Sequence, residues 1–285
     1  MNKKEFSIVY QILQDCLFSC NICNRRYVKS ESSLSFGQRK QMVDILSSNG
    51  AKRITITGGE PMLIKDEVTE LLKYIHDNKI HTCLSSTGFS FTRQYLQLLN
   101  GFLDHLLISV PTLDTKEWQH FFGAKDKSMM LYNNVIEILN NCQDTGIILE
   151  VCTVAQRNNI NKIEELGNML SAINRDIIWR IEYYYPMGIN AHLKTLFEVS
   201  QKEIEDLHSI IKNKFRNVFK DIYLSMPTRN NARDLLITPN GDLVNTSNNV
   251  YSSRLQNVFD PNLELNFKMR RNWRDYKKYL RDWSI

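Results

Sequence analysis

Three cysteines near the N-terminus, Cys16, Cys20 and Cys23, have a spacing suited to ligands of one metal centre. Cysteine thiolates are soft ligands that select zinc, copper(I) or iron–sulfur clusters. A closed zinc site needs a fourth Cys or His at a suitable spacing, and the next histidine, His76, is more than fifty residues away. Three thiolates on a four-iron cluster leave one iron without a protein ligand. The pattern therefore favours an iron–sulfur cluster with one open coordination position.

A second motif, Gly58-Gly59-Glu60-Pro61, directly follows a predicted strand. Paired glycines let a ligand approach the backbone closely, and Pro61 stiffens the turn. Glu60 adds a carboxylate that could bind an ammonium group. Gly-Gly turns after strands are common, but this one ends the next predicted strand after the cysteine motif. We therefore expect it to contribute to the same site.

The elements that must position both motifs alternate between strand and helix from about residue 50 to 185. Six strand-then-helix units in a row favour a parallel sheet with helices outside, as a full barrel, a partial barrel or an open sheet. The predicted strands are residues 7–13, 54–57, 81–86, 106–110, 147–154 and 177–184, and the predicted helices are residues 36–46, 68–75, 95–99, 131–142 and 160–170.

The alternation stops after residues 186–188. Ser200 and Glu203 have the spacing of a capping box at the start of a helix. Two short strands follow, over residues 221–224 and 235–238, and residues 239–242 read as a hairpin turn. We expect a small C-terminal extension from about residue 215.

Composition is ordinary for a soluble globular protein, with 285 residues, 42% hydrophobic and 24% charged. No apolar run approaches the ~18–20 residues of a membrane span, and the N-terminus lacks the apolar core of a signal peptide. The sequence predicts a cytoplasmic protein without a membrane partner. The net charge of +5 suits an anionic ligand without requiring nucleic acid. The cysteine clustering differs from a secreted disulfide scaffold.

Together, the cysteine motif, the Gly58–Pro61 motif and the strand–helix rhythm resemble the radical S-adenosylmethionine (radical SAM) superfamily, over about two thirds of the chain. The resemblance implies a [4Fe–4S] cluster on Cys16, Cys20 and Cys23, with S-adenosyl-L-methionine on the fourth iron. One electron would cleave that cofactor into methionine and a 5′-deoxyadenosyl radical, which abstracts a substrate hydrogen. The implied fold is α/β, a partial (β/α)6 barrel over residues 1–190 with a small α+β extension over residues 191–285.

The resemblance also assigns contacts to S-adenosylmethionine. Ser86-Thr87-Gly88 occupies the place of a common Thr-Asn-Gly, and Ser109 ends the fourth predicted strand. Lys125 stands where some relatives have an Arg, and Val154 would face the adenine side. The implied cofactor-binding residues are Gly58, Gly59, Glu60, Pro61, Ser86, Ser109, Lys125 and Val154.

Candidate catalytic residues come from the later strands. Glu150, Arg180 and Glu182 are charged residues in predicted barrel strands, where an inward charge is costly unless it is paired or liganded. They line a substrate pocket or form internal ion pairs. Tyr184, within a run of three tyrosines, either lines the pocket or packs in the core. Cys83, Cys142 and Cys152 are predicted to be small core residues, and the histidines to be surface or hydrogen-bonded polar residues.

The C-terminal region resembles the opening of a SPASM or Twitch extension, which carries auxiliary clusters in other family members. No cysteine follows Cys152, so we expect an extension without a cysteine-ligated cluster. Redox-neutral rearrangement or epimerisation of a peptide or natural-product intermediate is favoured. Residues 268–283 carry seven positive and two negative charges with interleaved aromatics, consistent with a helix docked on the domain or with nucleic-acid or leader-peptide contact.

Other functions remain open. Viperin-like enzymes use a Lys and an Asn in the fifth strand to hold a nucleotide, where this chain has Glu150 and Cys152, so a nucleotide or sugar substrate ranks below a peptide or small molecule. An iron–sulfur or zinc sensor would not need Gly58–Pro61, and an RNA-modifying enzyme would use the basic C-terminal run. Nucleic acid is disfavoured as a partner. The expected electron donor is a reductase or a flavodoxin- or ferredoxin-type protein.

Overall fold

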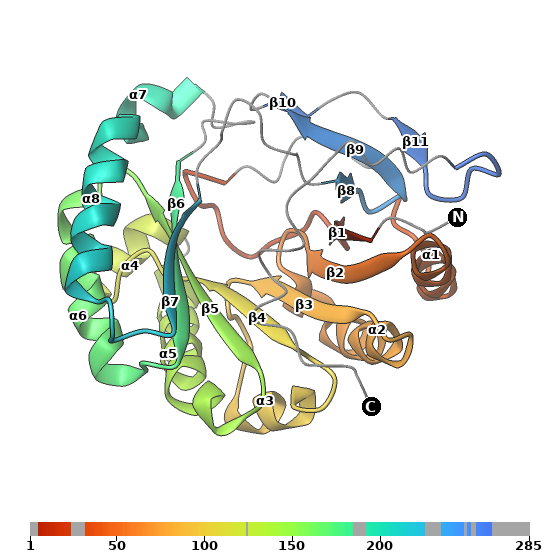
Figure 1. The fold of residues 1–285 in the computed structure, drawn as a ribbon, viewed down its shortest axis with the longest axis horizontal. Coiled ribbons are helices and arrows are strands. Elements are labelled where there is room, and N and C mark those ends of the chain that lie inside the picture. The colour runs from red at the N-terminus through yellow and green to blue at the C-terminus, as the bar shows by residue number, and fades with distance from the viewer. Residues whose placement is uncertain are drawn as a thin grey trace.

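A curved sheet of mostly parallel strands forms the centre of the molecule (Figure 1). The computed structural model describes residues 5–23, 32–123, 125–184, 192–225, 235–247, 250–251 and 255–263, with backbone alone at 125, 235, 245–247 and 250–251. Seven strands lie parallel in sequence order: β1 (Phe6–Gln11), β2 (Ala51–Thr57), β3 (His81–Ser86), β4 (His105–Ser109), β5 (Ile148–Ala155), β6 (Ile177–Tyr183) and β7 (Asp221–Ser225).

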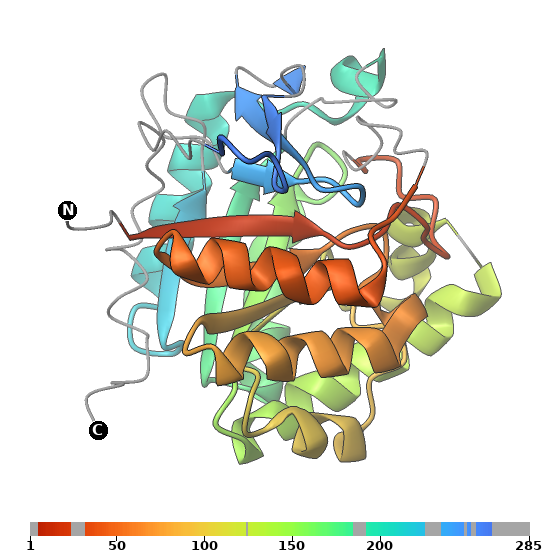
Figure 2. The same ribbon diagram turned by 90° about the vertical axis from the view of Figure 1, so that its right-hand side faces the viewer.

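Helices cover the outer face of this sheet, and Figure 2 shows the first two side by side against β1 and β2. They are α1 (Phe36–Ser48), α2 (Lys65–Asp77), α3 (Arg93–Leu99), α4 (Thr115–Phe122), α5 (Lys125–Asn141), α6 (Ile163–Ile173), α7 (Lys194–Phe197) and α8 (Gln201–Lys214). Short 3-10 turns lie at η1 (Pro61–Ile64), η2 (Cys142–Asp144) and η3 (Ile160–Lys162).

Periodicity explains these elements. Val68, Leu71, Leu72 and Ile75 repeat at helical spacing along α2, and all four are fully buried against the sheet. The centre of β4, residues Leu106 to Ile108, is apolar and buried, as is common for strands of a covered parallel sheet. The capping box at Ser200 and Glu203 is present at the start of α8, as the sequence predicts. The α/β class and the parallel sheet are confirmed.

The sheet continues past residue 190 at both of its edges. Strand β7 pairs in parallel with β6, and β8 (Leu235–Ile237) pairs in parallel with β1 at the opposite edge. The predicted hairpin turn connects β8 to the antiparallel β9 (Asp242–Ser247), which also pairs with β10 (Val250–Tyr251) and β11 (Gln256–Asn257). Segments on both sides of residue 190 therefore share hydrogen bonds in one sheet. The division of the chain into two domains at that residue stays a prediction.

The described strands form a partial barrel, because the strand order has β7 at one end and β10 at the other. Side chains alternate between the outer helices and the inner face, which we call the lumen. Among the described helices, none combines the length and apolar character that a bilayer crossing requires. The predicted basic helix at residues 268–283 lies outside the described residues.

Candidate active site

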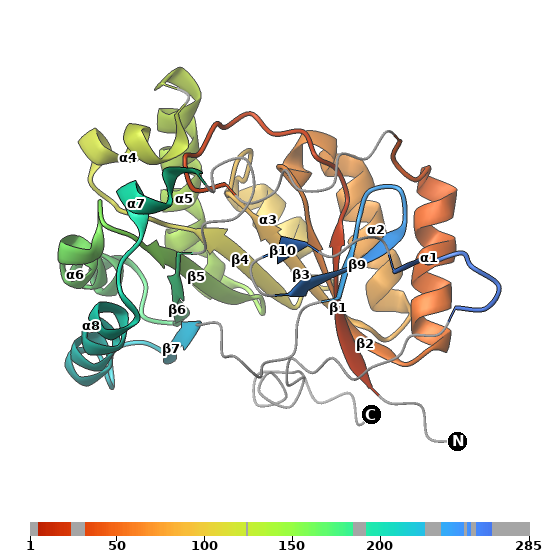
Figure 3. The same cartoon turned by 90° about the horizontal axis from the view of Figure 1, so that it is seen from above.

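The three predicted cluster ligands all belong to the segment that follows β1. This segment runs from the carboxyl end of β1 across the mouth of the barrel to α4 (Figure 3). Cys16 and Cys20 are partly buried and pack against the core, and Cys23 is also partly buried. The amide of Cys23 donates to the carbonyl oxygen of Cys20 at 3.1 Å, which closes a turn between the second and third thiols.

Gly59 fixes the position of this cysteine loop through backbone contact. Its amide donates to the Leu13 carbonyl oxygen at 2.8 Å, and the Glu60 amide donates to the Asp15 carbonyl oxygen at 2.8 Å. A Cβ at Gly59 would lie 1.8 Å from that Asp15 oxygen. The sequence predicts that the two glycines admit a ligand. In the structure, the group that approaches Gly59 is the backbone leading into Cys16.

Phe18 anchors the middle of the cysteine loop. Its ring packs edge-on against Phe89 and Phe122, with centroid separations of 6.0 and 5.7 Å. The amide of Ser19 donates to the Phe122 carbonyl oxygen at 3.2 Å, at the end of α4. Gly123 then adopts a left-handed conformation, with φ of 75°, and a Cβ there would meet the Ser19 oxygen at 3.0 Å. The loop is held from β2 on one side and from α4 on the other.

Glu60 connects the glycine motif to the end of β3. Its carboxylate is fully buried and accepts hydrogen bonds from Ser86 Oγ at 2.7 Å and from the amide of Met62 at 3.0 Å. Its other oxygen accepts from the Thr87 amide at 2.9 Å and from Thr87 Oγ1 at 2.5 Å. Burial raises the pKa of Glu60, and these hydrogen bonds oppose the rise. The predicted contact of Glu60 with an ammonium group stays a prediction.

Glu60→Gln is expected to lower the affinity for S-adenosylmethionine at least about tenfold while the iron content stays the same. An amide offers one acceptor oxygen in place of two, so a buried donor at Thr87 or Ser86 loses its partner, at a cost of about 1–3 kcal/mol. Equilibrium dialysis of the labelled cofactor against anaerobically reconstituted protein measures this. Glu137→Gln, on the exposed face of α5, is the matched control. Equal affinities in the two variants contradict the prediction.

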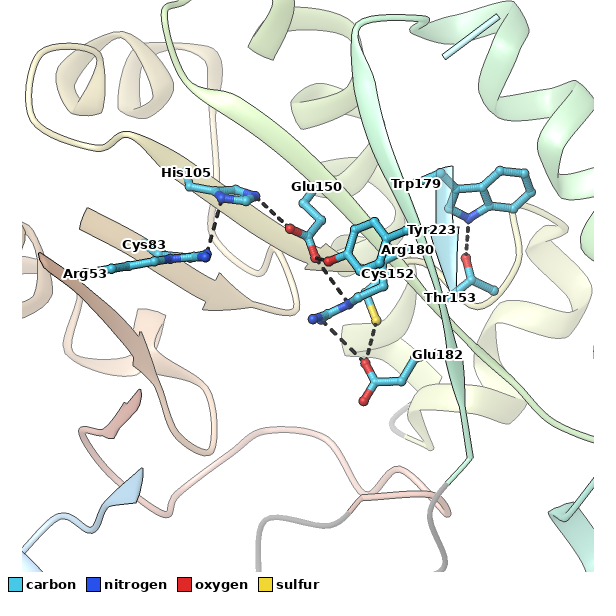
Figure 4. Close-up of polar contacts among 10 residues, drawn as sticks. All are labelled: Arg53, Cys83, His105, Glu150, Cys152, Thr153, Trp179, Arg180, Glu182 and Tyr223. Atoms are coloured by element: carbon cyan, nitrogen blue, oxygen red, sulfur yellow. Dashed lines mark hydrogen bonds and ion pairs between the residues drawn. The ribbon is translucent and has the colours of Figure 1, made fainter. Parts of the chain in front are cut away.

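The charged residues predicted from β5 and β6 meet in the lumen (Figure 4). Arg180 Nε lies 3.2 Å from Glu150 Oε1, and Arg180 Nη2 lies 3.5 Å from Glu182 Oε2. Glu150 is almost completely buried, whereas the side chains of Arg180 and Glu182 are 12% and 28% exposed. Cys152 Sγ donates to Glu182 Oε2 at 3.2 Å. Internal ion pairing is therefore observed, on the lumen face, and the lining of a substrate pocket stays a prediction.

Three further members of this cluster were not singled out from the sequence as site residues. Tyr223 of β7 donates to Glu150 Oε1 at 2.7 Å, and His105 Nε2 of β4 lies 2.9 Å from Glu150 Oε2. Arg53 of β2 lies with Nη2 3.3 Å from His105 Nδ1 and 3.1 Å from Cys83 Sγ. We call these residues the lumen cluster: Arg53, Cys83, His105, Glu150, Cys152, Arg180, Glu182 and Tyr223.

The contacts define the protonation of the lumen cluster. A guanidinium only donates, so His105 Nδ1 accepts from Arg53 and Nε2 carries the proton that is donated to Glu150. Burial lowers the pKa of His105, which keeps the ring neutral. Burial alone would raise the pKa of Glu150, but Arg180 and the donors His105 and Tyr223 hold it well below its usual range. Glu150 is therefore ionised and His105 is uncharged at neutral pH.

The remaining predicted site residues are placed as follows. Ser109 ends β4 in register with Cys152, and Val154 is in register with Glu182, so both belong to the lumen face near the barrel mouth. Tyr184 is buried, and its recorded ring contact is with Phe197 of α7 at 6.0 Å. Pro61 begins the η1 turn. Lys125 begins α5, and its side chain lies outside the described residues, as does Tyr185.

Cys83 and Cys152 are buried, as the sequence predicts, but they are not ordinary apolar core residues. Each thiol contacts a charged side chain of the lumen cluster, Arg53 for Cys83 and Glu182 for Cys152. Cys142, in contrast, is buried within the hydrophobic core beside α5. Cys83 and Cys152 occupy strand positions that face the lumen. Residue type alone does not distinguish these two cysteines from Cys142.

The cysteine loop fits the predicted cluster. Burial, followed by the neighbouring Cys23, raises the pKa of the Cys20 thiol to about 12. Within the described residues, no three Cys, His, Asp or Glu side chains have the compact arrangement that a single metal ion requires. The assignment of Cys16, Cys20 and Cys23 as cluster ligands therefore stays a prediction that rests on their residue type and spacing.

A cavity of about 240 Å³ opens beside the third cysteine. Asn21 and Ile22 of the cysteine loop, Phe121 of α4 and Phe197 of α7 contribute to its wall. Gln156, two residues beyond Val154, adds a buried amide to the same wall. The cavity therefore joins the cysteine loop to the carboxyl end of β5.

Comparisons with known proteins agree with the motifs. The model of the Radical SAM superfamily matches residues 10–170, more than half of the chain. GTP 3′,8-cyclase of Helicobacter pylori strain J99 is 27% identical over 203 residues, which cover 69% of this chain and 60% of that protein. The S-adenosylmethionine-dependent nucleotide dehydratase of Lacinutrix mariniflava is 24% identical over 237 residues, 79% of this chain and 46% of that protein. The chain thus spans about half to three fifths of these relatives.

Solved structures share the fold. SuiB of Streptococcus suis bound to S-adenosylmethionine aligns with a TM-score of 0.70 at 15% identity, over 85% of this chain and 60% of that chain. The anSMEcpe structure with bound AdoMet and the Kp18Cys peptide aligns with a TM-score of 0.70 at 13% identity, over 90% of this chain and 78% of that chain. At this level of identity, the likeness shows the partial-barrel fold alone.

Proposed function

The chain belongs to the radical SAM superfamily, whose enzymes use a [4Fe–4S] cluster and S-adenosylmethionine, and we propose that it is such an enzyme, acting on a substrate held in the lumen. When bound, the two cofactors supply a 5′-deoxyadenosyl radical that removes a hydrogen atom from the substrate. The observation that carries the proposal is the cysteine loop locked to Gly59 at the barrel mouth, above the lumen cluster.

Different residues of this chain bind the cluster and S-adenosylmethionine. Cys16, Cys20 and Cys23 hold the cluster, and the Gly58–Pro61 segment with Ser86 and Ser109 forms the wall against S-adenosylmethionine. The cavity beside Ile22 and Gln156 accepts the adenosine part, close to Val154. Lys125 supplies a positive charge. Apart from that of Lys125, which begins α5, these assignments are supported by a common position at the carboxyl ends of β1 to β5, where parallel α/β sheets bind their ligands.

Glu150, Arg180 and Glu182 bind and orient the substrate. Their support is the burial of charge on the lumen face, with Arg180 and Glu182 still partly exposed. Tyr184 contributes from the end of β6, through its packing on Phe197.

The substrate we favour is a peptide or a natural-product intermediate. SuiB and anSMEcpe, which share the fold, have been solved with the precursor peptide SuiA and with the Kp18Cys peptide. A nucleotide is the second candidate, favoured by the names of the sequence relatives, a GTP cyclase and a nucleotide dehydratase. An external reductase, or a flavodoxin- or ferredoxin-type protein, would deliver the electron.

Anaerobic reconstitution with iron and sulfide, followed by reduction and addition of S-adenosylmethionine, tests the proposal. We expect about four irons per chain and formation of 5′-deoxyadenosine, detected by mass spectrometry. Cys20→Ala should lose both the cluster and the product, whereas Cys142→Ala, which removes a thiol from the core, should keep both. Zinc in place of iron, or a cluster and product that survive in Cys20→Ala, contradicts the assignment.

A further inference from the structure

The end of the lumen cluster nearest the barrel mouth consists of Arg180 and Glu182. Strand register orders the layers, since Glu150 pairs with Ile178, Cys152 with Arg180, and Val154 with Glu182. Glu182 therefore stands about four residues nearer the carboxyl end of β6 than the layer of Glu150. Exposure follows the same order, from 1% for the Glu150 side chain to 12% for Arg180 and 28% for Glu182. A substrate entering from the mouth meets this pair first.

Both guanidinium groups of the lumen cluster already have partners. Arg180 lies between Glu150 and Glu182, and Arg53 contacts Cys83 and neutral His105. Two arginines and two glutamates bring the charge of the described cluster close to zero. A nucleoside triphosphate needs cationic groups that are free to pair with phosphate, because a buried charge without a partner is strongly disfavoured. Here the phosphates would instead face two carboxylates.

The same pair is well suited to an amide. Glu182 Oε2 takes the contacts with Arg180 and Cys152, while Oε1 has no partner among the described residues. A partly exposed carboxylate beside a guanidinium presents one acceptor and one donor side by side. A peptide group presents the complement, an N–H and a C=O, and carries no net charge that the balanced cluster would have to neutralise.

We propose that Glu182 sets the specificity of the lumen: with Arg180 it binds an amide group of the substrate, and it excludes polyphosphates. This inference rests on the proposed function and names the substrate class for the same site. It favours a peptide or another amide-bearing molecule over the nucleotides in the names of the sequence relatives.

In the test, inorganic tripolyphosphate is titrated as the probe into the anaerobically reconstituted full chain. Isothermal titration calorimetry at constant ionic strength measures its binding. Wild-type protein should bind the probe weakly. Glu182→Gln leaves Arg180 with one carboxylate partner and should bind tripolyphosphate at least about tenfold more tightly. Glu164→Gln is the matched control, since it removes the same charge from an exposed pair with Lys214 on the outer helices. It should bind like wild type.

A second probe, N-acetyl-alanyl-alanine methylamide, tests amide binding by saturation-transfer NMR. Wild type and Glu182→Gln, which both keep an acceptor at this position, should give a signal, and Glu182→Ala should lose it. If Glu182→Gln does not fold, Glu182→Ala also releases Arg180 and serves in the tripolyphosphate titration.

Three results overturn the inference: wild type binding tripolyphosphate as tightly as Glu182→Gln, Glu182→Gln behaving like Glu164→Gln, or no amide signal with wild type. Neither binding assay requires cofactor cleavage. If the protein forms no 5′-deoxyadenosine but shows the expected binding, the proposed function is wrong. The inference that Glu182 sets the specificity of the lumen then still holds.

Discussion

Gly59→Ala is expected to abolish cluster binding and to destabilise the barrel mouth. The new Cβ would lie 1.8 Å from the Asp15 carbonyl oxygen, 2.4 Å from the Asp15 carbonyl carbon and 2.5 Å from the Gln14 oxygen. All three are backbone atoms, so no side-chain rotation relieves the overlap. The strand end and the cysteine loop must separate by more than 1 Å, because real Cβ contacts under 3.0 Å essentially never occur.

This separation would break the hydrogen bonds from Gly59 to Leu13 and from Glu60 to Asp15, directly before Cys16. Iron content after reconstitution should fall at least about tenfold, since site geometry determines metal affinity. Gly37→Ala is the control, because a Cβ at Gly37 meets no atom within 4 Å and alanine favours the α1 helix. Iron in Gly59→Ala at the Gly37→Ala level would show that backbone packing does not position the loop.

Glu150→Ala should have the largest effect on stability of any lumen substitution. Glu150 accepts from Tyr223 and His105 and pairs with Arg180. Removing one partner of a buried ion pair costs about 3–5 kcal/mol of the free energy of unfolding, because the other charge stays buried. In a chain of this size the melting temperature should fall by roughly 10 °C. Thermal unfolding followed by circular dichroism, with all variants free of the cluster, measures the shift.

The double variant Glu150→Met with Arg180→Met provides the decisive comparison. Replacing both partners of a buried pair by apolar side chains is often nearly neutral, so the double variant should be more stable than Glu150→Ala. Glu164→Ala, in an exposed pair with Lys214, should melt close to wild type. Additive losses in the double variant, or a Glu150→Ala shift as small as that of Glu164→Ala, would remove the basis for a tightly coupled cluster.

The elements of the barrel were predictable because their signals are local. The apolar spacing of α2 and the apolar centre of β4 each lie within a few residues, and such local patterns predict a helix and a strand directly. The cysteine spacing and the Gly58–Pro61 motif are local in the same sense. The pairing of β7 with β6 and of β8 with β1, which extends the sheet on both sides, was not predictable, because pairing depends on contacts between distant segments.

The lumen cluster was predicted only in part for the same reason. Glu150, Arg180 and Glu182 stood out as charges within strands, and the identical argument applies to Arg53 in β2. His105 and Tyr223 required the register, since their significance is that both face Glu150. Gly59 shows a different limit. Its small size was evident from the sequence, but which group approaches it depends on the path of the cysteine loop.

The pairing of β1 with β8 has a consequence for how the chain matures during synthesis. Val9 and Tyr10 pair with Leu236 and Ile237, more than 220 residues later, and the Leu34 amide donates to the Pro239 carbonyl oxygen at 2.8 Å. Contacts of such long sequence separation form late, because a long loop must close first. On the ribosome, the second edge of β1 stays uncovered until the hairpin of β8 and β9 has emerged. The cysteine loop continues directly from β1, so its final shape, and with it iron insertion, belongs to the time after the hairpin of β8 and β9 has been synthesised.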